Sequence, residues 1–101
     1  MERMEKILLA KQLDGILVSS SANMRSSVGF RGEGIVFVSR NRPLVFTDSR
    51  YTIAAKQECP EADVIRYKKN IYESWLTELM ERLGREAVAG MSIGFEDETM
   101  T

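Results

Sequence analysis

The architecture of this chain follows from one stretch, RPLVFTDSRYTIAAKQE, residues 42–58. Within it, the four β-favouring residues from Leu44 to Thr47 carry no charge, which predicts a strand covered on both faces of a sheet. Asp48 and Ser49 come next, and their side-chain oxygens are expected to accept hydrogen bonds from the first free amides of a helix. That helix is expected to pack on the sheet and to end before Pro60. A strand that turns directly into a helix predicts a layered α/β domain.

The segments before this stretch supply a helix and two further strands. A first helix is expected from about Glu2 to Leu13, ending at Asp14-Gly15, and the apolar residues Ile16–Val18 form a short strand after it. The glycine-rich segment Met24–Gly34 lacks the spacing of a nucleotide-binding fingerprint and the Gly-Lys-Ser/Thr ending of a phosphate loop, so we interpret it as a tight turn. Ile35–Val38 is the next strand, and its short connection to the strand of the central stretch predicts a hairpin.

The segments after this stretch predict a strand, a long helix and a last strand. The first of these strands is expected at Ala62–Tyr67 and the last at Met91–Phe95. Asn70 is expected to cap the intervening helix, in a capping box with Glu73, and Gly84 is expected to close it. The apolar stripe of that helix is expected to contain Tyr72, Trp75, Leu76, Leu79 and Leu83, with Trp75 as a core anchor rather than a ligand platform.

Size and composition fit one small domain. The chain has 101 residues, of which 44% are hydrophobic, enough for one core. The order of elements predicts a three-layer α/β fold, with a mixed sheet of about five strands and helices on both faces. The sequence contains no apolar run of membrane-spanning length and no secretory signal, and Cys59 is its single cysteine, so we expect a reducing, cytoplasmic location. The net charge of −1 favours neither nucleic acid nor a membrane as a partner.

No residue of this chain is predicted to be catalytic or to bind a metal. The sequence has no histidine, which removes histidine acid–base chemistry, the Ser–His and Cys–His nucleophile pairs and most zinc sites. Cys59, beside Pro60, is interpreted as a small, partly buried side chain. Asp48 and Arg50 could be a functional pair, but a helix cap with a nearby salt bridge is the commoner explanation. Residues 25–69 carry nine Lys and Arg against five Asp and Glu, so this basic middle could receive an anion or could simply be solvated.

Several segments occur together in the order and spacing of a known family. They are Asp14–Val18, the loop Asn23–Arg25 with Gly29–Gly32, Gly34–Val38, Leu44–Tyr51 and Ile93–Glu96. Together they resemble the N-terminal domain of the creatinase/prolidase/aminopeptidase P family, and the resemblance covers nearly the whole chain. Its most specific part is the Thr-Asp-Ser-Arg-Tyr turn combined with the Gly-Phe-x-Gly loop.

The resemblance implies a ribonuclease-H-like fold for residues 1–101, followed in the parent by a pita-bread catalytic domain that is absent here. Because Glu96–Thr101 reads as a helix start, we expect the chain to be truncated at its C-terminal end. The parent would be a metal-dependent Xaa-Pro dipeptidase or aminopeptidase, with two divalent ions, manganese or cobalt, in the absent domain and no cofactor in this chain. The partners of this non-catalytic domain would be its own catalytic domain and a second copy in a homodimer, and it would shape the rim of the substrate cleft.

The resemblance also names candidate site residues. The candidates for the substrate rim or an interface are Asn23, Arg25, Phe30, Arg31, Asp48, Arg50 and Tyr51. The sequence departs from the family at Ser26 and Ser27, where an aromatic and an aliphatic residue are usual, and at Arg31, which replaces a small hydroxyl residue. A looser loop or different substrate contacts are therefore expected. Two other functions stay open: a free-standing α/β module that binds an anionic small molecule through the basic middle, and the N-terminal domain of a creatinase-type non-peptidase hydrolase.

Overall fold

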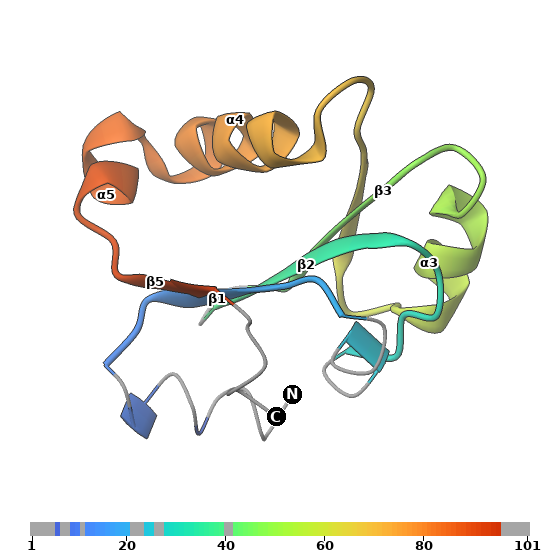
Figure 1. Ribbon diagram of the computed structural model, residues 1–101, viewed down its shortest axis with the longest axis horizontal. Coiled ribbons are helices and arrows are strands. Elements are labelled where there is room, and N and C mark those ends of the chain that lie inside the picture. The colour runs from blue at the N-terminus through green and yellow to red at the C-terminus, as the bar shows by residue number, and fades with distance from the viewer. Residues whose placement is uncertain are drawn as a thin grey trace.

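A computed structural model describes residues 6, 9–10, 12–20, 24–25, 28–39 and 42–95, which contain a five-stranded mixed sheet (Figure 1). The predicted three-layer α/β fold, with helices on both faces of the sheet, is confirmed. The strands are β1 (Gly15–Val18), β2 (Gly34–Ser39), β3 (Leu44–Thr47), β4 (Asp63–Arg66) and β5 (Ile93–Phe95), and the described part of the chain includes the helices α3 (Thr52–Glu58), α4 (Ile71–Leu83) and α5 (Arg85–Ala89).

The strands lie in the order β4-β3-β2-β1-β5. β2 pairs antiparallel with β1 and β3, whereas the β3–β4 and β1–β5 pairs are parallel. The β2–β3 pair is the predicted hairpin, in which Gly34 lies opposite Thr47 and Phe37 lies opposite Leu44. β3 is flanked by β2 and β4, and all four of its residues are buried, as its uncharged sequence predicts.

Alternation along the strands divides the core into two layers. On the α3 side, the buried strand residues Ile16, Val18, Val36, Val38 and Val45 pack with Ala55 and Cys59. On the α4 side, Leu17, Ile35, Phe37, Leu44 and Phe46 pack with Trp75 and Leu79. Figure 1 shows α4 and α5 together above the sheet, well separated from α3. The domain therefore has the predicted helix–sheet–helix layering, with the β3–α3 turn at one end of the sheet.

The predicted cap of α4 is confirmed at Asn70, whose side chain accepts hydrogen bonds from the N–H groups of Tyr72 and Glu73 at 3.0 and 3.1 Å. The role of Trp75 as a core anchor is also confirmed, because it is buried against Phe37 with ring centroids 5.7 Å apart. The predicted stripe is too wide, however, since three of its members are exposed. These are Tyr72, Leu76 and Leu83, at 52%, 40% and 37%. Arg82 of α4 forms an ion pair with Asp63 at 2.8 Å, and the buried residues Trp75 and Leu79 pack on the sheet.

Gly84 closes α4 as predicted, with φ at 92° and its N–H bonded to the carbonyl of Met80 at 2.9 Å. A five-residue helix that was not predicted, α5, starts at the next residue. So short a helix carries little periodic signal, and its Val88 packs on the α4-side core together with Met91, which follows the helix.

The prediction that Gly15 ends the first helix is wrong, because Gly15 is the first residue of β1 and pairs with Ser39. A Cβ atom at Gly15 would collide with the ring of Phe37, so the core requires glycine here. The left-handed backbone conformation occurs earlier, at Gln12, whose φ is 55°. Of the predicted helix Glu2–Leu13, residues Lys6, Leu9 and Ala10 are described and helical, and the predicted helix start at residues 96–101 lies outside the described part of the chain.

Candidate functional site

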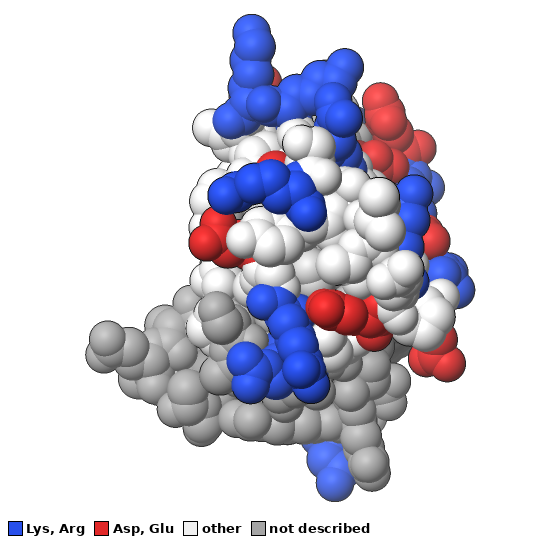
Figure 2. Space-filling view, turned by 90° about the vertical axis from the view of Figure 1, so that its right-hand side faces the viewer, with Lys and Arg blue, Asp and Glu red and all other residues white. Residues whose placement is uncertain are grey.

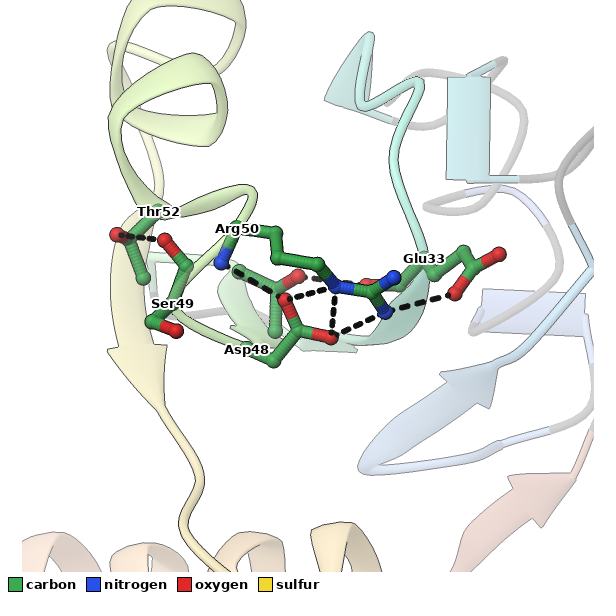
Figure 3. A network of polar contacts seen from close by, with 6 residues as sticks. Glu33, Asp48, Ser49, Arg50 and Thr52 are labelled. Atoms are coloured by element: carbon green, nitrogen blue, oxygen red, sulfur yellow. Dashed lines mark hydrogen bonds and ion pairs between the residues drawn. The ribbon is translucent and has the colours of Figure 1, made fainter.

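The candidate site is the turn between β3 and α3, where Arg50 and Asp48 form a two-pronged ion pair (Figure 3). Nη2 of Arg50 lies 2.7 Å from Oδ2 of Asp48, and Nε lies 3.2 Å from each carboxylate oxygen. The backbone N–H of Arg50 donates to Oδ1 of Asp48 at 2.9 Å. The predicted helix cap at Asp48 and Ser49 is therefore wrong: the N-cap is Tyr51, it makes no side-chain cap bond, and Asp48 instead closes its own turn.

The same guanidinium reaches from this turn to the loop before β2. Figure 3 shows Arg50 between Asp48 and Glu33, and its Nη2 lies 3.3 Å from Oε2 of Glu33. The hydroxyl of Thr47 donates to the carbonyl of Glu33 at 2.6 Å, which fixes the loop to the end of β3. Glu33 was not among the predicted site residues, although the predicted hairpin indicates its position. Because Gly34 pairs with Thr47, the residue before Gly34 must lie beside the residue after Thr47.

An aromatic pair supports the site from the α3-side core. Phe30 is fully buried, and a Cβ atom at Gly32 would lie 2.7 Å from its ring and 2.9 Å from the ring of Tyr51. Gly32 therefore lets the two rings approach the loop backbone closely. The guanidinium carbon of Arg50 lies 5.2 Å from the ring centroid of Tyr51, within the range of a cation–π contact. Arg50 is thus held by two carboxylates and one aromatic face.

The structure brings most of the predicted site residues to this one end of the sheet. Asp48, Arg50 and Tyr51 are in mutual contact, and Phe30 packs behind them as a core residue without exposed surface. Arg31 is exposed, and its backbone N–H donates to Oε1 of Glu58 at 2.9 Å, which fastens the loop to the end of α3. Arg25 is exposed as well, and its carbonyl accepts a hydrogen bond from Gly29 at 2.9 Å. Asn23, Ser26 and Ser27 lie outside the described residues.

This arrangement fixes the position of the Arg50 guanidinium, but its described residues include no activated nucleophile. Both carboxylates are engaged by Arg50, whose side chain stays 66% exposed. Nη1 of Arg50 makes no hydrogen bond within the part of the chain that the structure describes, so it can donate to an incoming anionic or carbonyl oxygen. Figure 2 shows Lys and Arg side chains spread over this side of the molecule. The site is suited to binding and orienting a group rather than to transforming one.

The Arg50 contact lowers the pKa of the Asp48 carboxyl, mainly through the side-chain hydrogen bonds, while Asp48 raises the pKa of Arg50 in return. Since the pKa of Asp48 is lower in the folded than in the unfolded chain, the pair stabilises the fold above the unfolded-state pKa. That contribution is lost as the pH falls through the lowered folded-state value.

Arg50→Gln should therefore raise the pKa of Asp48, as measured by an NMR titration of its carboxyl carbon. The matched variant Arg85→Gln, at an exposed arginine of α5, should leave it unchanged, and an Asp48 that titrates normally in the wild-type chain would contradict the pairing.

Cys59 is not suited to nucleophilic chemistry. It is 2% exposed, and burial is the main cause that raises the pKa of its thiol, so the thiolate is disfavoured. It is more deeply buried than predicted. Among the described residues, no group of three or more Cys, Asp or Glu side chains could hold a metal ion. No helix in the same part of the chain is long and apolar enough to cross a membrane.

With this geometry in place, comparison with known proteins defines the class. The family model described as "Creatinase/Prolidase N-terminal domain" matches residues 1–101, and the chain belongs to this family. A curated relative, the uncharacterized peptidase YqhT of Bacillus subtilis (strain 168), is 26% identical over 102 residues. That match covers 100% of this chain and 27% of the relative, so the chain spans about a quarter of the relative's length.

Solved structures share the fold. The chain superposes on an Xaa-Pro dipeptidase from Bacillus anthracis with a TM-score of 0.79 at 24% identity, covering 99% of this chain and 27% of that one. An aminopeptidase P structure from Streptococcus thermophilus gives a TM-score of 0.69 at 25% identity, covering 98% of this chain and 91% of that one. The N-terminal domain of the cytoplasmic peptidase PepQ from Mycobacterium tuberculosis H37Rv gives 0.69 at 21% identity, with 94% and 88% covered. The relationship that the sequence motifs suggest is thereby confirmed.

Proposed function

We propose that this chain is the non-catalytic N-terminal domain of a metal-dependent Xaa-Pro dipeptidase or aminopeptidase that acts in the cytoplasm. The observation that carries this proposal is the family match over residues 1–101. The relatives are named as peptidases, and the matched part is about a quarter of the curated relative's length, which leaves room for a separate catalytic domain. Two divalent metal ions, manganese or cobalt, would belong to that domain. The described residues of this chain offer no cluster that fits a metal.

Within such an enzyme, we assign this domain two roles: contacts in a homodimer, and a share of the rim of the substrate cleft. The rim role is supported by the fixed, exposed guanidinium of Arg50, which two carboxylates orient without covering it. The exposed side chains of Arg25 and Arg31 come from the loop that precedes β2. A basic rim can attract the carboxylate of a short peptide before the peptide reaches the metal ions. Phe30 has no part in substrate contact because it is buried.

A domain exchange tests this function. In the test protein, residues 1–101 replace the matching N-terminal quarter of the Bacillus anthracis dipeptidase, and hydrolysis of Xaa-Pro dipeptides is measured with added manganese. We expect the exchanged enzyme to turn over substrate and the 101-residue chain alone to show no turnover. Arg50→Gln in the exchanged enzyme should raise KM about three- to tenfold with little change in kcat, as expected for loss of one charge-assisted contact.

The matched control is again Arg85→Gln, which changes an exposed arginine of α5 away from the β3–α3 turn. Turnover by the isolated chain, persisting after contaminating peptidases are removed, would overturn the non-catalytic assignment. A folded, metal-loaded exchange enzyme with an unchanged KM after Arg50→Gln would remove the rim role and leave the domain assignment in place.

A further inference from the structure

β4 is an edge strand whose outer side pairs with no strand of the described residues. Its inner side pairs with β3, since the N–H of Asp63 donates to the carbonyl of Pro43 and that of Tyr67 donates to the carbonyl of Thr47. Alternate residues of a strand present their backbone groups to opposite edges, so Val64 and Arg66 direct their N–H and C=O groups outward. Val64 and Arg66 thus each offer one backbone N–H donor and one C=O acceptor at the outer edge of β4.

The first residue of β4, Asp63, is paired with Arg42 and Arg82, and the exposed charges of this edge that form no such pair are separated by sign. Glu61 precedes the strand, while Arg66, Lys68 and Lys69 lie at its other end, and all four are exposed. None of the four takes part in an ion pair within the part of the chain that the structure describes. Figure 2 shows Lys and Arg side chains gathered at the top of that face, at the height of the β4–α4 connection in Figure 1. With one unpaired acid at one end and unpaired bases at the other, the edge is complementary in its unpaired charges to an antiparallel copy of itself.

The neighbouring helix runs beside this edge and carries charges of both signs, with Glu73 in its first turn and Arg82 in its last. α4 starts just after the basic end of β4, and Arg82 near its C-terminus reaches Asp63 at the first residue of the strand, so α4 runs antiparallel to β4. Glu81 therefore lies toward the acidic end of the edge. A groove of about 690 Å³ separates the β4 edge from α4, and Ile65 and Arg66 line it together with Thr77 and Glu81. The helix leaves the edge open to another strand.

We propose that β4 pairs antiparallel with β4 of a second copy of this chain, with Ile65 next to the twofold axis. Val64 of each copy then lies opposite Arg66 of the other, and these two residues exchange both backbone hydrogen bonds in each of the two symmetric pairs. The same register places Glu61 opposite Lys69 of the second copy. It also brings Lys68 of the second copy toward the end of the groove at which Glu81 lies. This inference rests on the dimer that is part of the proposed function and names the surface that forms it.

The proposed contact is small, since β4 has four residues, and so it should associate weakly and depend on concentration in the isolated chain. The charged pairs contribute register and selectivity more than affinity. The register makes a specific prediction, because a charge reversed at one end of the edge in one copy can be matched by a reversal at the other end in its partner.

Sedimentation equilibrium of the 101-residue chain, over micromolar to millimolar concentrations, tests this pairing. Glu61→Lys and Lys69→Glu should each weaken self-association about tenfold, because each replaces two attractive pairs by two repulsive ones. A mixture of the two variants should restore association, since both pairs across the mixed dimer are again opposite in sign. The double variant Glu61→Lys, Lys69→Glu should also self-associate like the wild type. The control variants Glu86→Lys and Arg85→Glu, on α5, should leave association unchanged.

A backbone variant removes the edge donor without touching the β3 ladder. Arg66→Pro deletes an outward N–H group, and proline is tolerated on an edge strand, so the circular dichroism spectrum should persist while self-association is lost. A chain that is monomeric at every concentration, or charge variants whose mixture does not recover association, would overturn the proposed surface. If the domain-exchange enzyme is active and dimeric while Arg66→Pro leaves its dimer intact, the proposed function stands and this interface is wrong.

Discussion

Gly34→Ala is expected to destabilise the chain by more than about 4 kcal/mol, a large part of the total stability of about 5–15 kcal/mol for a domain of this kind. Gly34 has φ at +151°, a backbone conformation that favours glycine, and it lies opposite Thr47 in the hairpin. A Cβ atom would collide with the carbonyl oxygen of Phe46, which belongs to the backbone of the central strand and cannot rotate away. Denaturant titration followed by circular dichroism measures the loss.

Gly84→Ala is the matched control for this experiment. Gly84 also has a positive φ, at +92°, but a Cβ atom there would meet nothing within 4 Å. Its cost should be limited to the left-handed conformation itself, about 1–2 kcal/mol. If both variants lose the same stability, the collision with Phe46 does not control the hairpin, and the explanation given for Gly34 is wrong.

Phe30→Ala is expected to destabilise the chain by about 3–5 kcal/mol, the usual cost of removing a buried phenylalanine. The ring of Phe30 is 0% exposed and belongs to the α3-side core with Met24 and Val45. It also packs against Gly32, so its loss should loosen the loop that carries Glu33 and thereby weaken the contact with Arg50. Urea unfolding measures the first effect, and amide hydrogen exchange of residues 29–34 measures the second.

The corresponding control is Phe95→Ala, because Phe95 is 60% exposed at the end of β5. Truncating it should cost about 1 kcal/mol or less, since most of its ring remains in water and only an edge contact with Trp75 is lost. Equal losses at Phe30 and Phe95 would show that Phe30 does not anchor the core. In that case its assignment as a core residue, rather than as part of the rim, would fail.

The two controls separate effects that a sequence alone places together. From the sequence, Gly34 and Gly84 are both predicted to end a turn or a helix. Phe30 and Phe95 are both phenylalanines that follow a glycine. Their surroundings differ because the hairpin brings Phe46 onto Gly34, while the chain leaves Gly84 in open space. A similar distinction applies to the site: Arg50 acts at the surface of a turn whose stability depends on the buried ring behind it.

Local patterns were sufficient for much of the fold. The uncharged run Leu44–Thr47 has the composition of a strand covered on both faces, and it is one. Asn70 and Gly84 supply the chemistry that the two ends of α4 require, because caps involve only neighbouring residues. The order of these elements already limited the chain to a mixed, three-layer α/β domain. The same locality explains why the motif Thr-Asp-Ser-Arg-Tyr could indicate the family before any contact was known.

Contacts between distant segments were beyond such patterns. Asp48 has the sequence of a helix cap, yet Arg50 and the approach of Glu33 across the hairpin make it the centre of an ion pair. Gly15 resembles a helix terminator, but the ring of Phe37 on the neighbouring strand is what excludes a side chain there. The outer edge of β4 likewise exists only because β3 occupies its other side. Short-range chemistry is written in adjacent residues, whereas burial, pairing and free edges depend on which distant segments the folded chain brings together.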